Sequence, residues 1–359
     1  MAPPTMKALV TIEEKTAAVQ SVPVPTPGEG EILVKVHYAA QNPTDWKSMR
    51  GVPPGRILGC DFAGTIENAN GSHWREGQRV AGWVHGASSN PTRGVFAEYA
   101  VTEASLVFPI PDSVSYQSAA VVPLAVATAV QALFQRLGLP EPSKPATSAI
   151  PVLIYGGSTS VGYYAIQLSK LAGLFVVATG SKKNSELLKT LGADATVDYN
   201  DADWPEQVRR LTHDKLEHAL DCISEKGSQQ GIAKALSPVK GGHIITLLPV
   251  KDDLREEVRA LNGKAKVEAT IAYTVFRRAL GLQQPANYAA FDYQRGENDT
   301  PEDKAFWEKY LAQLPDLLAT GKLVPNKVRE FGGIDDILAG FKEHAEGNVR
   351  AEKLVYKIA

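Results

Sequence analysis

The sequence has very few cysteines, little net charge and no long apolar run, and each absence excludes a class of protein. Only Cys60 and Cys222 occur among 359 residues, too few for a disulfide scaffold or a zinc site of four cysteines. A net charge of −2 without a long Lys/Arg run argues against binding to nucleic acid or an anionic membrane. No apolar run approaches the roughly 20 residues that span a bilayer, and the first residues lack a secretory signal. We therefore expect a cytoplasmic protein.

The composition is typical of a folded protein with about two domains. Hydrophobic residues make up 44% and charged residues 22%, and a prior of roughly 150 residues per domain gives two domains. Short strand-like runs separated by Gly, Pro and Asn fill the first 110 residues and predict a small barrel or sandwich. From residue 151, strand and helix patterns alternate and predict a parallel sheet with helices on both faces. The predicted fold class is α/β, with a separate β domain.

Individual elements follow from the same periodicities. Strands are expected in the β part at residues 6–12, 31–38, 57–67, 79–84 and 95–101. Strands are expected in the α/β part at residues 152–155, 175–179, 195–199, 217–223, 243–248 and 267–275. Helices are expected at residues 115–137, 306–317 and 332–344, a surface excursion at 281–303 and a closing strand at 353–358.

A glycine-rich turn follows the first strand of the α/β part and precedes a helical pattern. The dinucleotide-binding fingerprint is G-x-G-x-x-G, and the corresponding residues here are Gly157, Ser158, Thr159, Ser160, Val161 and Gly162. Thr159 replaces the middle glycine. Small residues let the backbone approach a pyrophosphate, and the helix N-terminus supplies free N–H groups. The context predicts a dinucleotide site, with a plain glycine-rich turn as the alternative.

The end of the next strand indicates which dinucleotide is bound. An NAD site usually has an acidic residue there, which accepts hydrogen bonds from the ribose hydroxyls. This strand ends instead with Ser181, Lys182, Lys183 and Asn184. The two lysines would attract a 2′-phosphate, and the Ser and Asn side chains can donate hydrogen bonds to it. The sequence therefore predicts NADP(H), with two solvated surface lysines as the alternative.

Motifs along the whole chain resemble the medium-chain dehydrogenase/reductase superfamily. The segments that carry the resemblance begin with Gly30-Glu-Ile-Leu-Val-Lys-Val, Gln41-Asn-Pro-Thr-Asp-Trp-Lys47, Leu58-Gly-Cys-Asp-Phe-Ala-Gly64, Gly77-Gln-Arg-Val-Ala-Gly82 and Gly94-Val-Phe-Ala-Glu-Tyr99. They continue with residues 156–162, 191–199 and 352–356. Within the superfamily, Tyr155-Gly-Gly-Ser-Thr, Ala219-Leu-Asp-Cys-Ile223 and the C-terminal Glu-Lys-Leu-Val resemble a zinc-free fungal branch that holds trans-acting enoyl reductases of polyketide pathways.

The resemblance implies a fold in two domains. A GroES-like β domain would comprise residues 1–120 and be completed by residues 320–359. A Rossmann domain that binds NADP would comprise residues 121–319, and the active site would lie in the cleft. Monomers and homodimers both occur among such enzymes.

Alcohol dehydrogenases of this superfamily hold a catalytic zinc, and the resemblance does not extend to its ligands. Asn42 stands near the place of the first Cys ligand, and Cys60 and Asp61 stand where Gly-His-Glu would be. A catalytic zinc needs three protein ligands, so we expect no metal. Without a Lewis acid, the expected chemistry shifts from alcohol oxidation to hydride addition across an activated C=C bond.

The resemblance also assigns roles to single residues. Thr44, Asp45, Trp46 and Lys47 would lie beside the cofactor, where Lys47 binds the nicotinamide ribose or stabilises an enolate. Other cofactor contacts would come from Tyr199, Leu247, Leu248, Val349 and Arg350. Pro123, Thr128, Ala269 and Tyr273 would contact substrate, with Thr128 donating to its carbonyl and Tyr273 as a candidate proton donor.

Each of these roles has an ordinary structural alternative. Lys47 can be an exposed loop lysine, and Trp46 and Tyr199 can be packed aromatic residues. Thr128 can bond to its own helix backbone.

The leading hypothesis is an NADPH-dependent reductase of α,β-unsaturated carbonyl compounds or enoyl thioesters. Its substrate would be a free small molecule or a group bound to the carrier of a polyketide synthase. An NADPH quinone oxidoreductase and a non-catalytic NADPH-binding subunit are the alternatives, because fold does not determine function.

Overall fold

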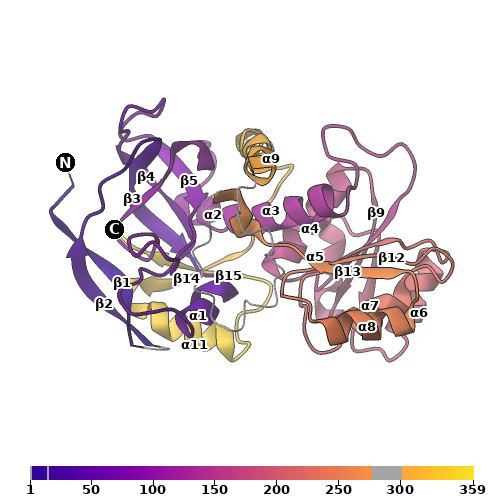
Figure 1. Cartoon of the computed structure of the whole chain (residues 1–359). Helices are drawn as coiled ribbons and strands as arrows, with labels where there is room; N and C mark the ends of the chain where they lie inside the picture. The colour runs from indigo at the N-terminus through magenta and orange to yellow at the C-terminus, as the bar shows by residue number, and fades with distance from the viewer. Residues whose placement is uncertain (1, 14–15, 277–300) are drawn as a thin grey trace. The chain divides into compact units, whose positions relative to one another are not determined.

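The computed structural model describes residues 2–13, 16–276 and 301–359, which form two compact units (Figure 1). The first unit contains residues 2–13, 16–124, 273–276 and 301–359, and the second contains residues 125–272. A mainly antiparallel sheet forms the first unit, and a parallel sheet forms the second. Both parts of the predicted α/β fold class are therefore present.

The first unit is built on a sheet with strand order β14-β15-β3-β4-β5-β7, and β6 also pairs with β3. Its strands are β3 (Glu31–Ala40), β4 (Asp61–Asn68), β5 (Arg79–Trp83), β6 (Tyr99–Glu103), β7 (Val107–Pro109), β14 (Val328–Gly333) and β15 (Lys353–Lys357). Alternate residues of β3, namely Ile32, Val34 and Val36, are fully buried in one hydrophobic cluster, and Leu33 on the opposite face is buried in another. β15 pairs antiparallel with β3, so the C-terminal segment completes this sheet.

The second unit contains a parallel sheet with the order β10-β9-β8-β11-β12-β13. Its strands are β8 (Pro151–Tyr155), β9 (Phe175–Gly180), β10 (Ala195–Asp198), β11 (His218–Asp221), β12 (Gly242–Thr246) and β13 (Ala265–Ala269). Helices α4 (Ser160–Leu171) and α5 (Ser185–Thr190) cover one face, and α6 (Trp204–Leu211), α7 (Ser228–Ala235) and α8 (Asp252–Leu261) cover the other (Figure 1). This is the strand order of the doubly wound Rossmann fold, which reverses direction at β8. In such sheets, ligands bind at the carboxyl ends of the strands where the order reverses.

Several boundaries differ from the sequence expectations. The strand expected at 57–67 begins only at Asp61, because Gly59 has a positive φ of 95° and turns the chain. The strand expected at 267–275 ends at Ala269, and a 3₁₀ helix, η4 (Ala272–Phe276), follows. The surface excursion expected at 281–303 lies mostly outside the described residues.

Three strands were missed, namely β2, β14 and the three-residue β7. β2 (Thr16–Pro23) pairs with β1 (Thr5–Glu13) in a separate two-stranded sheet, and only one of its residues is buried, so it carries no clear alternation. β14 lies inside a region for which we expected only the helix now found as α11 (Ile337–Ala345), and none of its residues is fully buried.

The helical region expected at 115–137 is divided into α2 (Tyr116–Ala120), α3 (Pro123–Val130) and a π-helical turn, η2 (Gln131–Arg136). By length and composition, Tyr116–Arg136 could cross a membrane, which corrects the expectation that no apolar run approaches that length. However, 83% of its most apolar window is buried inside the protein, as in a core helix.

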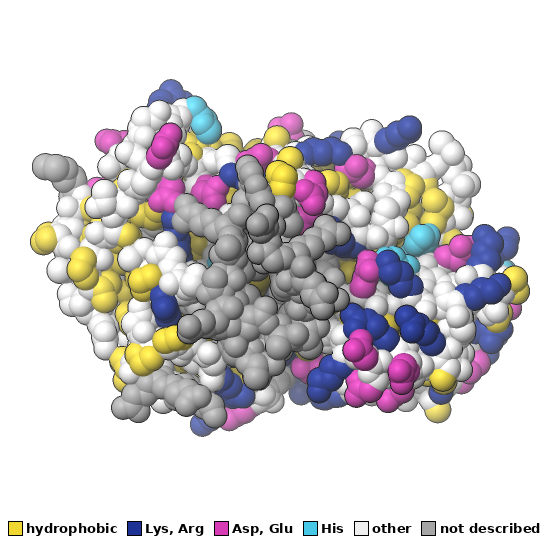
Figure 2. Space-filling view, viewed as in Figure 1, with side chains coloured by type: hydrophobic (Ala, Val, Ile, Leu, Met, Phe, Trp, Pro, Cys, Tyr) yellow, Lys and Arg dark blue, Asp and Glu magenta, His cyan; other side chains and the backbone are white. Residues whose placement is uncertain are grey.

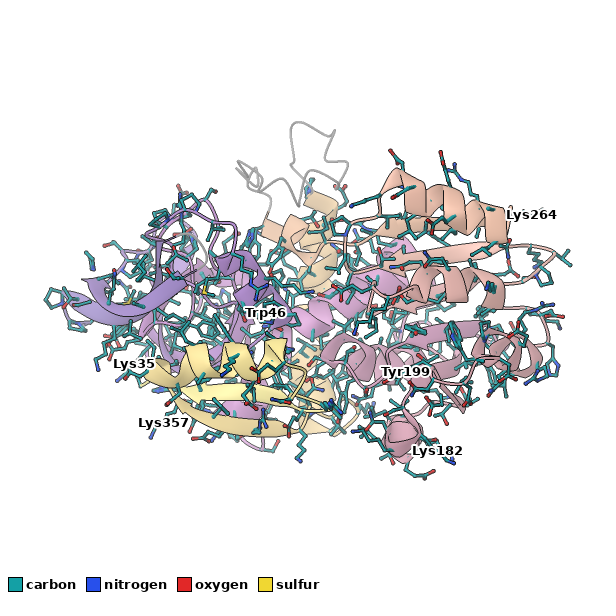
Figure 3. The ribbon with its side chains drawn as sticks, turned by 90° about the horizontal axis from the view of Figure 1, so that it is seen from below. Lys35, Trp46, Lys182, Tyr199, Lys264 and Lys357 are labelled. Atoms are coloured by element: carbon teal, nitrogen blue, oxygen red, sulfur yellow. The ribbon has the colours of Figure 1, made fainter. Side chains whose placement is uncertain are left out.

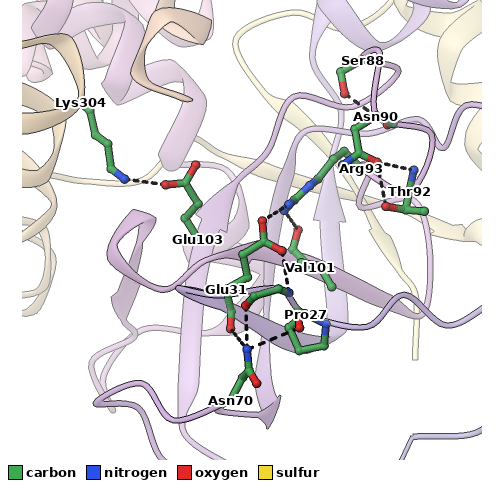
Figure 4. Close-up of polar contacts among 11 residues, drawn as sticks. Pro27, Glu31, Asn70, Ser88, Asn90, Thr92, Arg93, Val101, Glu103 and Lys304 are labelled. Carbon is green, nitrogen blue, oxygen red and sulfur yellow. Dashed lines mark hydrogen bonds and ion pairs between the residues drawn. The ribbon is translucent and has the colours of Figure 1, made fainter. Parts of the chain in front are cut away.

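The two units divide between Leu124 and Ala125, close to the boundary expected at 120/121. Helices α9 (Pro301–Leu311) and α10 (Leu314–Ala319), however, belong to the first unit rather than to the Rossmann part. Trp307 on α9 is buried, and Lys304 forms an ion pair of 2.5 Å with Glu103 at the end of β6 (Figure 4). These contacts with distant strands could not be inferred from local periodicity.

Charged side chains of both signs are interspersed on the face drawn in Figure 2, where Lys and Arg lie beside Asp and Glu. Ion pairs of the second unit illustrate this, with Lys240 2.8 Å from Glu217 and Lys266 2.8 Å from Glu268. The arrangement agrees with the low net charge of the sequence.

Candidate functional site

The glycine-rich turn lies at the carboxyl end of β8, where the strand order of the second unit reverses. Gly156 has a φ of 81°, a conformation that favours glycine. A Cβ on Gly162 would lie 2.4 Å from the carbonyl oxygen of Gly156, so the first turn of α4 packs directly on the turn. Glycine at 162 is therefore required by close backbone approach.

Thr159 explains the departure from the G-x-G-x-x-G pattern. Its Oγ1 accepts a hydrogen bond of 3.1 Å from the backbone N–H of Gly162, and its hydroxyl donates to the Gly156 carbonyl at 2.9 Å. Thr159 is thus the N-cap of α4 and also closes the turn. A glycine at this position could do neither.

This turn fits a phosphate group. The backbone N–H groups of Ser160 and Val161 lie in the first turn of α4, where a helix offers no internal acceptor. The N-terminus of this 12-residue helix also carries a partial positive charge. Ser158, Thr159, Ser160 and Val161 remain partly exposed, so a pyrophosphate can approach them.

The next predicted contact region follows β9. Ser181–Asn184 contains a short 3₁₀ helix, η3 (Lys182–Asn184), in which both lysines are exposed. Figure 3 shows Lys182 at the edge of the second unit. The two cations can therefore reach an anionic group in solvent.

An acidic residue approaches this segment from the neighbouring strand. Asp198 at the end of β10 accepts a hydrogen bond of 3.0 Å from the backbone N–H of Lys182. Hydrogen bonds from Asn200 and Lys182 hold the pKa of Asp198 below its ordinary value. Because Asp198 ends β10 and not β9, the residues at the end of β9 alone do not reveal this acid. Tyr199 follows directly and is 44% exposed, so it is not a packed core residue (Figure 3).

The carboxyl ends of β11 and β12 are joined by Asp221 and Ser224. The buried Asp221 carboxylate accepts hydrogen bonds from the backbone of Ser224 and from the Ser228 hydroxyl, at 2.9 and 2.5 Å. The Ser224 hydroxyl in turn accepts from the backbone N–H of Leu247 at 2.8 Å. The hydrogen bond from Leu247 to Ser224 fixes the backbone at Leu247 and Leu248, both of which are partly buried. Sequence reasoning missed both organising residues. The partners of Asp221 follow it closely in the sequence, whereas Ser224 binds Leu247 at the end of β12.

Thr128 and Ala269 come from adjacent segments of the second unit. Thr128 is partly buried on α3, and Ala269 is the last residue of β13. Just after each, the side chains of Gln131 and Thr270 form a hydrogen bond of 2.5 Å. Pro123, which begins α3, is buried and belongs to the first unit.

In the first unit, helix α1 (Pro43–Met49) carries four of the predicted cofactor contacts. The Asp45 carboxylate accepts the backbone N–H of Asn42 at 2.6 Å and so caps its own helix. Burial raises the pKa of Asp45 to about 7. Asp45 is only 2% exposed, so it supports α1 from within rather than facing a ligand directly.

The other residues of α1 are partly exposed. The Lys47 ammonium and the Arg50 guanidinium lie 5.6 and 5.0 Å from the centre of the Trp46 ring, within range of a cation–π interaction. Trp46 is therefore neither a fully buried core residue nor a free surface one. Lys47 is partly exposed and lies near the Trp46 ring.

The positions compared with zinc ligands are engaged in another arrangement. The fully buried Asp61 accepts hydrogen bonds from Asn42 Nδ2 at 3.0 Å, from the Leu124 backbone N–H at 2.8 Å and from Lys353 Nζ at 2.6 Å. Lys353 also donates to the Val121 carbonyl at 3.3 Å. Among the described residues, no three His, Cys, Asp or Glu side chains are grouped to hold a metal ion. Asp61 instead links α1, the start of α3 and β15.

Tyr273 is brought beside α1 although it lies 229 positions away in the sequence. Its Oη is 2.8 Å from Thr44 Oγ1 and 3.6 Å from Cys60 Sγ. Two predicted ligand contacts, Thr44 and Tyr273, therefore meet within the first unit.

The last predicted cofactor contacts precede β15. Val349 is partly exposed and Arg350 is exposed, and Arg350 Nε donates to the Gly347 carbonyl at 2.8 Å. The roles of these two residues stay predictions.

Two family models match the chain, one in each unit. The model described as the alcohol dehydrogenase GroES-like domain matches residues 28–112, and the zinc-binding dehydrogenase model matches residues 160–247. The first unit is thus a GroES-like domain, and the second has the parallel Rossmann-like sheet. These matches also imply a nicotinamide cofactor.

Curated relatives match over nearly the whole chain. A trans-enoyl reductase of Alternaria alternata is 37% identical, covering 99% of this chain and 99% of the relative. One from Penicillium oxalicum is 35% identical, covering 94% and 92%. The structure of a quinone oxidoreductase from Coxiella burnetii superposes with a TM-score of 0.70 at 22% identity, covering 99% and 100%, and shows the shared fold. The chain therefore belongs to the medium-chain dehydrogenase/reductase superfamily and, within it, to the fungal enoyl reductase branch of oxidoreductases.

Proposed function

We propose that this protein is an NADPH-dependent reductase of activated C=C bonds that acts on an enoyl thioester carried by a polyketide synthase. The observation that carries the proposal is the turn at residues 156–162, capped by Thr159 and followed after β9 by two exposed lysines. The names of the relatives, trans-enoyl reductases, support the reaction type. The carrier-bound substrate is our inference from the family resemblance.

The second unit would hold the cofactor through residues of three strand ends. The N–H groups of Ser160 and Val161 at the start of α4 would bind the pyrophosphate. Lys182 and Lys183 would attract a 2′-phosphate, with Ser181 and Asn184 as donors. The negative charge of Asp198 would repel a bound 2′-phosphate. Its hydrogen bonds from backbone N–H groups partly offset this charge. We therefore assign NADPH rather than NADH as the cofactor, because of the two lysines.

The bound nicotinamide would supply a hydride, and the protein would manage the charge that develops on the substrate. The Lys47 ammonium would stabilise the enolate oxygen as a cation, and the Thr128 hydroxyl would donate a hydrogen bond to the thioester carbonyl. Donors aimed at developing charge are typically worth about 2.7–4 kcal/mol each. Neither residue needs to change its ionisation state for this role.

A titration with two cofactors tests the binding step. NADPH and NADH are added to the purified protein, and binding is followed by fluorescence. We expect tight NADPH binding that weakens at least tenfold in the variant Lys182→Glu with Ser181→Ala, while NADH binding changes little. The matched control is Lys215→Glu, a charge reversal at another exposed lysine of the same unit. Equal effects on both cofactors would refute the 2′-phosphate assignment.

A substrate panel tests the reaction. Enones, quinones, free enoyl thioesters and enoyl thioesters on a carrier domain are compared by NADPH consumption. We expect turnover of enoyl thioesters, fastest when they are carrier-bound. A preference for quinones would favour an NADPH quinone oxidoreductase instead. Binding of NADPH without turnover of any class would favour a non-catalytic subunit.

A further inference from the structure

Tyr273 is held rigidly by aromatic side chains of the first unit. Its ring stacks on His85, with centroids 4.0 Å apart and planes at 22°, and lies 5.5 Å from the Trp83 ring at a tilt. Phe276, one helical turn later in η4, packs edge-on against Trp83 at 4.6 Å. These contacts fix the direction of the phenol without using its hydroxyl.

The Tyr273 hydroxyl joins a short row of proton-carrying groups. Tyr273 Oη lies 2.8 Å from Thr44 Oγ1, and Thr44 Oγ1 lies 3.5 Å from Ser48 Oγ, one turn further along α1. All three side chains are partly exposed. Each hydroxyl can donate one hydrogen bond and accept another, so the row can pass a proton in either direction.

A thiol lies on the other side of the phenol. Cys60 Sγ is 3.6 Å from Tyr273 Oη, within the range for a sulfur hydrogen bond. Burial raises the pKa of the Cys60 thiol, so it stays protonated and can donate to a negatively charged oxygen. A phenolate at Tyr273 would therefore accept from the Thr44 hydroxyl and have the Cys60 Sγ within hydrogen-bond range.

We propose that Tyr273 donates the proton that completes reduction of the C=C bond, and that Thr44 and Ser48 return a proton to it from solvent. This proposal rests on the proposed function. Once hydride has been added at the β-carbon, the substrate is an enolate. The O–H bond of Tyr273 then breaks, a C–H bond forms at the α-carbon, and a phenolate remains. The Thr44 proton moves to the phenolate, the Ser48 proton to Thr44 and a water proton to Ser48, so one solvent proton is consumed.

The variant Tyr273→Phe tests the donor because it keeps the ring contacts and removes only the hydroxyl. The probe is the N-acetylcysteamine thioester of 2-methylbut-2-enoic acid, whose reduction creates a stereocentre at the α-carbon. General acid catalysis typically contributes 10²–10⁴-fold, so we expect kcat to fall about 100-fold while the NADPH Kd stays unchanged. Wild type should give one enantiomer, and Tyr273→Phe a mixture, because solvent would then protonate both faces.

Two further variants test the relay and provide the control. Thr44→Val should lower kcat, and Thr44→Ser, which keeps a hydroxyl, should restore it. The matched control is Tyr116→Phe on α2, where the ring packs against His37 and under Arg79, and it should behave as wild type.

The outcomes separate this proposal from the proposed function. If Tyr273→Phe keeps the wild-type kcat and a single enantiomer, Tyr273 is not the donor, although the protein is still an enoyl reductase. If Tyr273→Phe does not fold, equal activity of Thr44→Val and Thr44→Ser would overturn the relay. If the wild type reduces no enoyl thioester, free or carrier-bound, the proposed function itself fails.

Discussion

The buried ion pair between Asp61 and Lys353 gives the sharpest prediction about stability. The two side chains are 0% and 3% exposed, and Lys353 Nζ lies 2.6 Å from Asp61 Oδ2. The variant Lys353→Met keeps most of the side-chain volume and removes the cation. It leaves the Asp61 carboxylate buried without its counter-charge.

The magnitude follows from the groups that remain. Removing one partner of a buried pair costs about 3–5 kcal/mol because an uncompensated charge stays in the interior. Asp61 would still accept from Asn42 Nδ2 and the Leu124 N–H, so we expect a value near the lower end, about 3 kcal/mol. If the free energy of unfolding falls by about 2 kcal/mol per M of urea, the urea concentration at the unfolding midpoint should fall by about 1.5 M.

Tryptophan fluorescence during urea unfolding is a suitable assay. Four of the five tryptophans, Trp46, Trp74, Trp83 and Trp307, lie in the first unit with the ion pair, and only Trp204 lies in the second. The signal therefore reports mainly on the unit that is perturbed.

The double variant Asp61→Asn with Lys353→Met provides the control. Replacing both charges is often neutral, whereas breaking the pair is not, so the double variant should be more stable than Lys353→Met alone. A wild-type midpoint for Lys353→Met would refute the reasoning. So would a double variant that is less stable than both single variants.

Three other predictions address the cofactor turn, the proposed cation and pH. Gly162→Ala should abolish NADPH binding in a fluorescence titration, because the new Cβ would lie 2.4 Å from the Gly156 carbonyl oxygen; unchanged affinity would contradict the close packing. Lys47→Ala should lower kcat on an enoyl thioester at least tenfold with little change in the urea midpoint, and unchanged kinetics would remove Lys47 from the mechanism. Because burial raises the pKa of Asp45 from 3.8 to about 7, the folded state holds a proton that the unfolded state releases, so stability should fall as pH rises from about 4 to 7. Asp45→Asn should flatten this fall in urea midpoints measured across that range, and an equally steep fall would show that another group is responsible.

Local sequence determined much of the Rossmann unit. The strand-turn-helix pattern around residues 151–171 is contiguous, and its apolar spacing and small residues specify β8, the turn and α4 without reference to distant segments. The strand and helix order likewise follows from periodicity, because parallel strands joined by helices allow few arrangements. The sequence could also show that Lys182 and Lys183 follow β9, because that depends only on position along the chain.

Tertiary structure decided the features that depend on pairs of distant residues. The approach of Asp198 to Lys182, the link from Ser224 to Leu247 and the contact of Tyr273 with Thr44 each join separate elements. Periodicity describes one helix or strand at a time and gives no information about contacts between residues of different elements.

The clearest case is Asp61. In the sequence it is one carboxylate near a cysteine, open to interpretation as a metal ligand. In the folded first unit it accepts hydrogen bonds from Asn42, Leu124 and Lys353, the last of them 292 positions away. A buried charge is stable only when it is paired or hydrogen-bonded, and the groups that do this can come from any part of the chain. The sequence therefore determined that residue 61 is an aspartate. Its partners, and with them its role, depend on the tertiary structure, in which the C-terminal strand β15 pairs with β3.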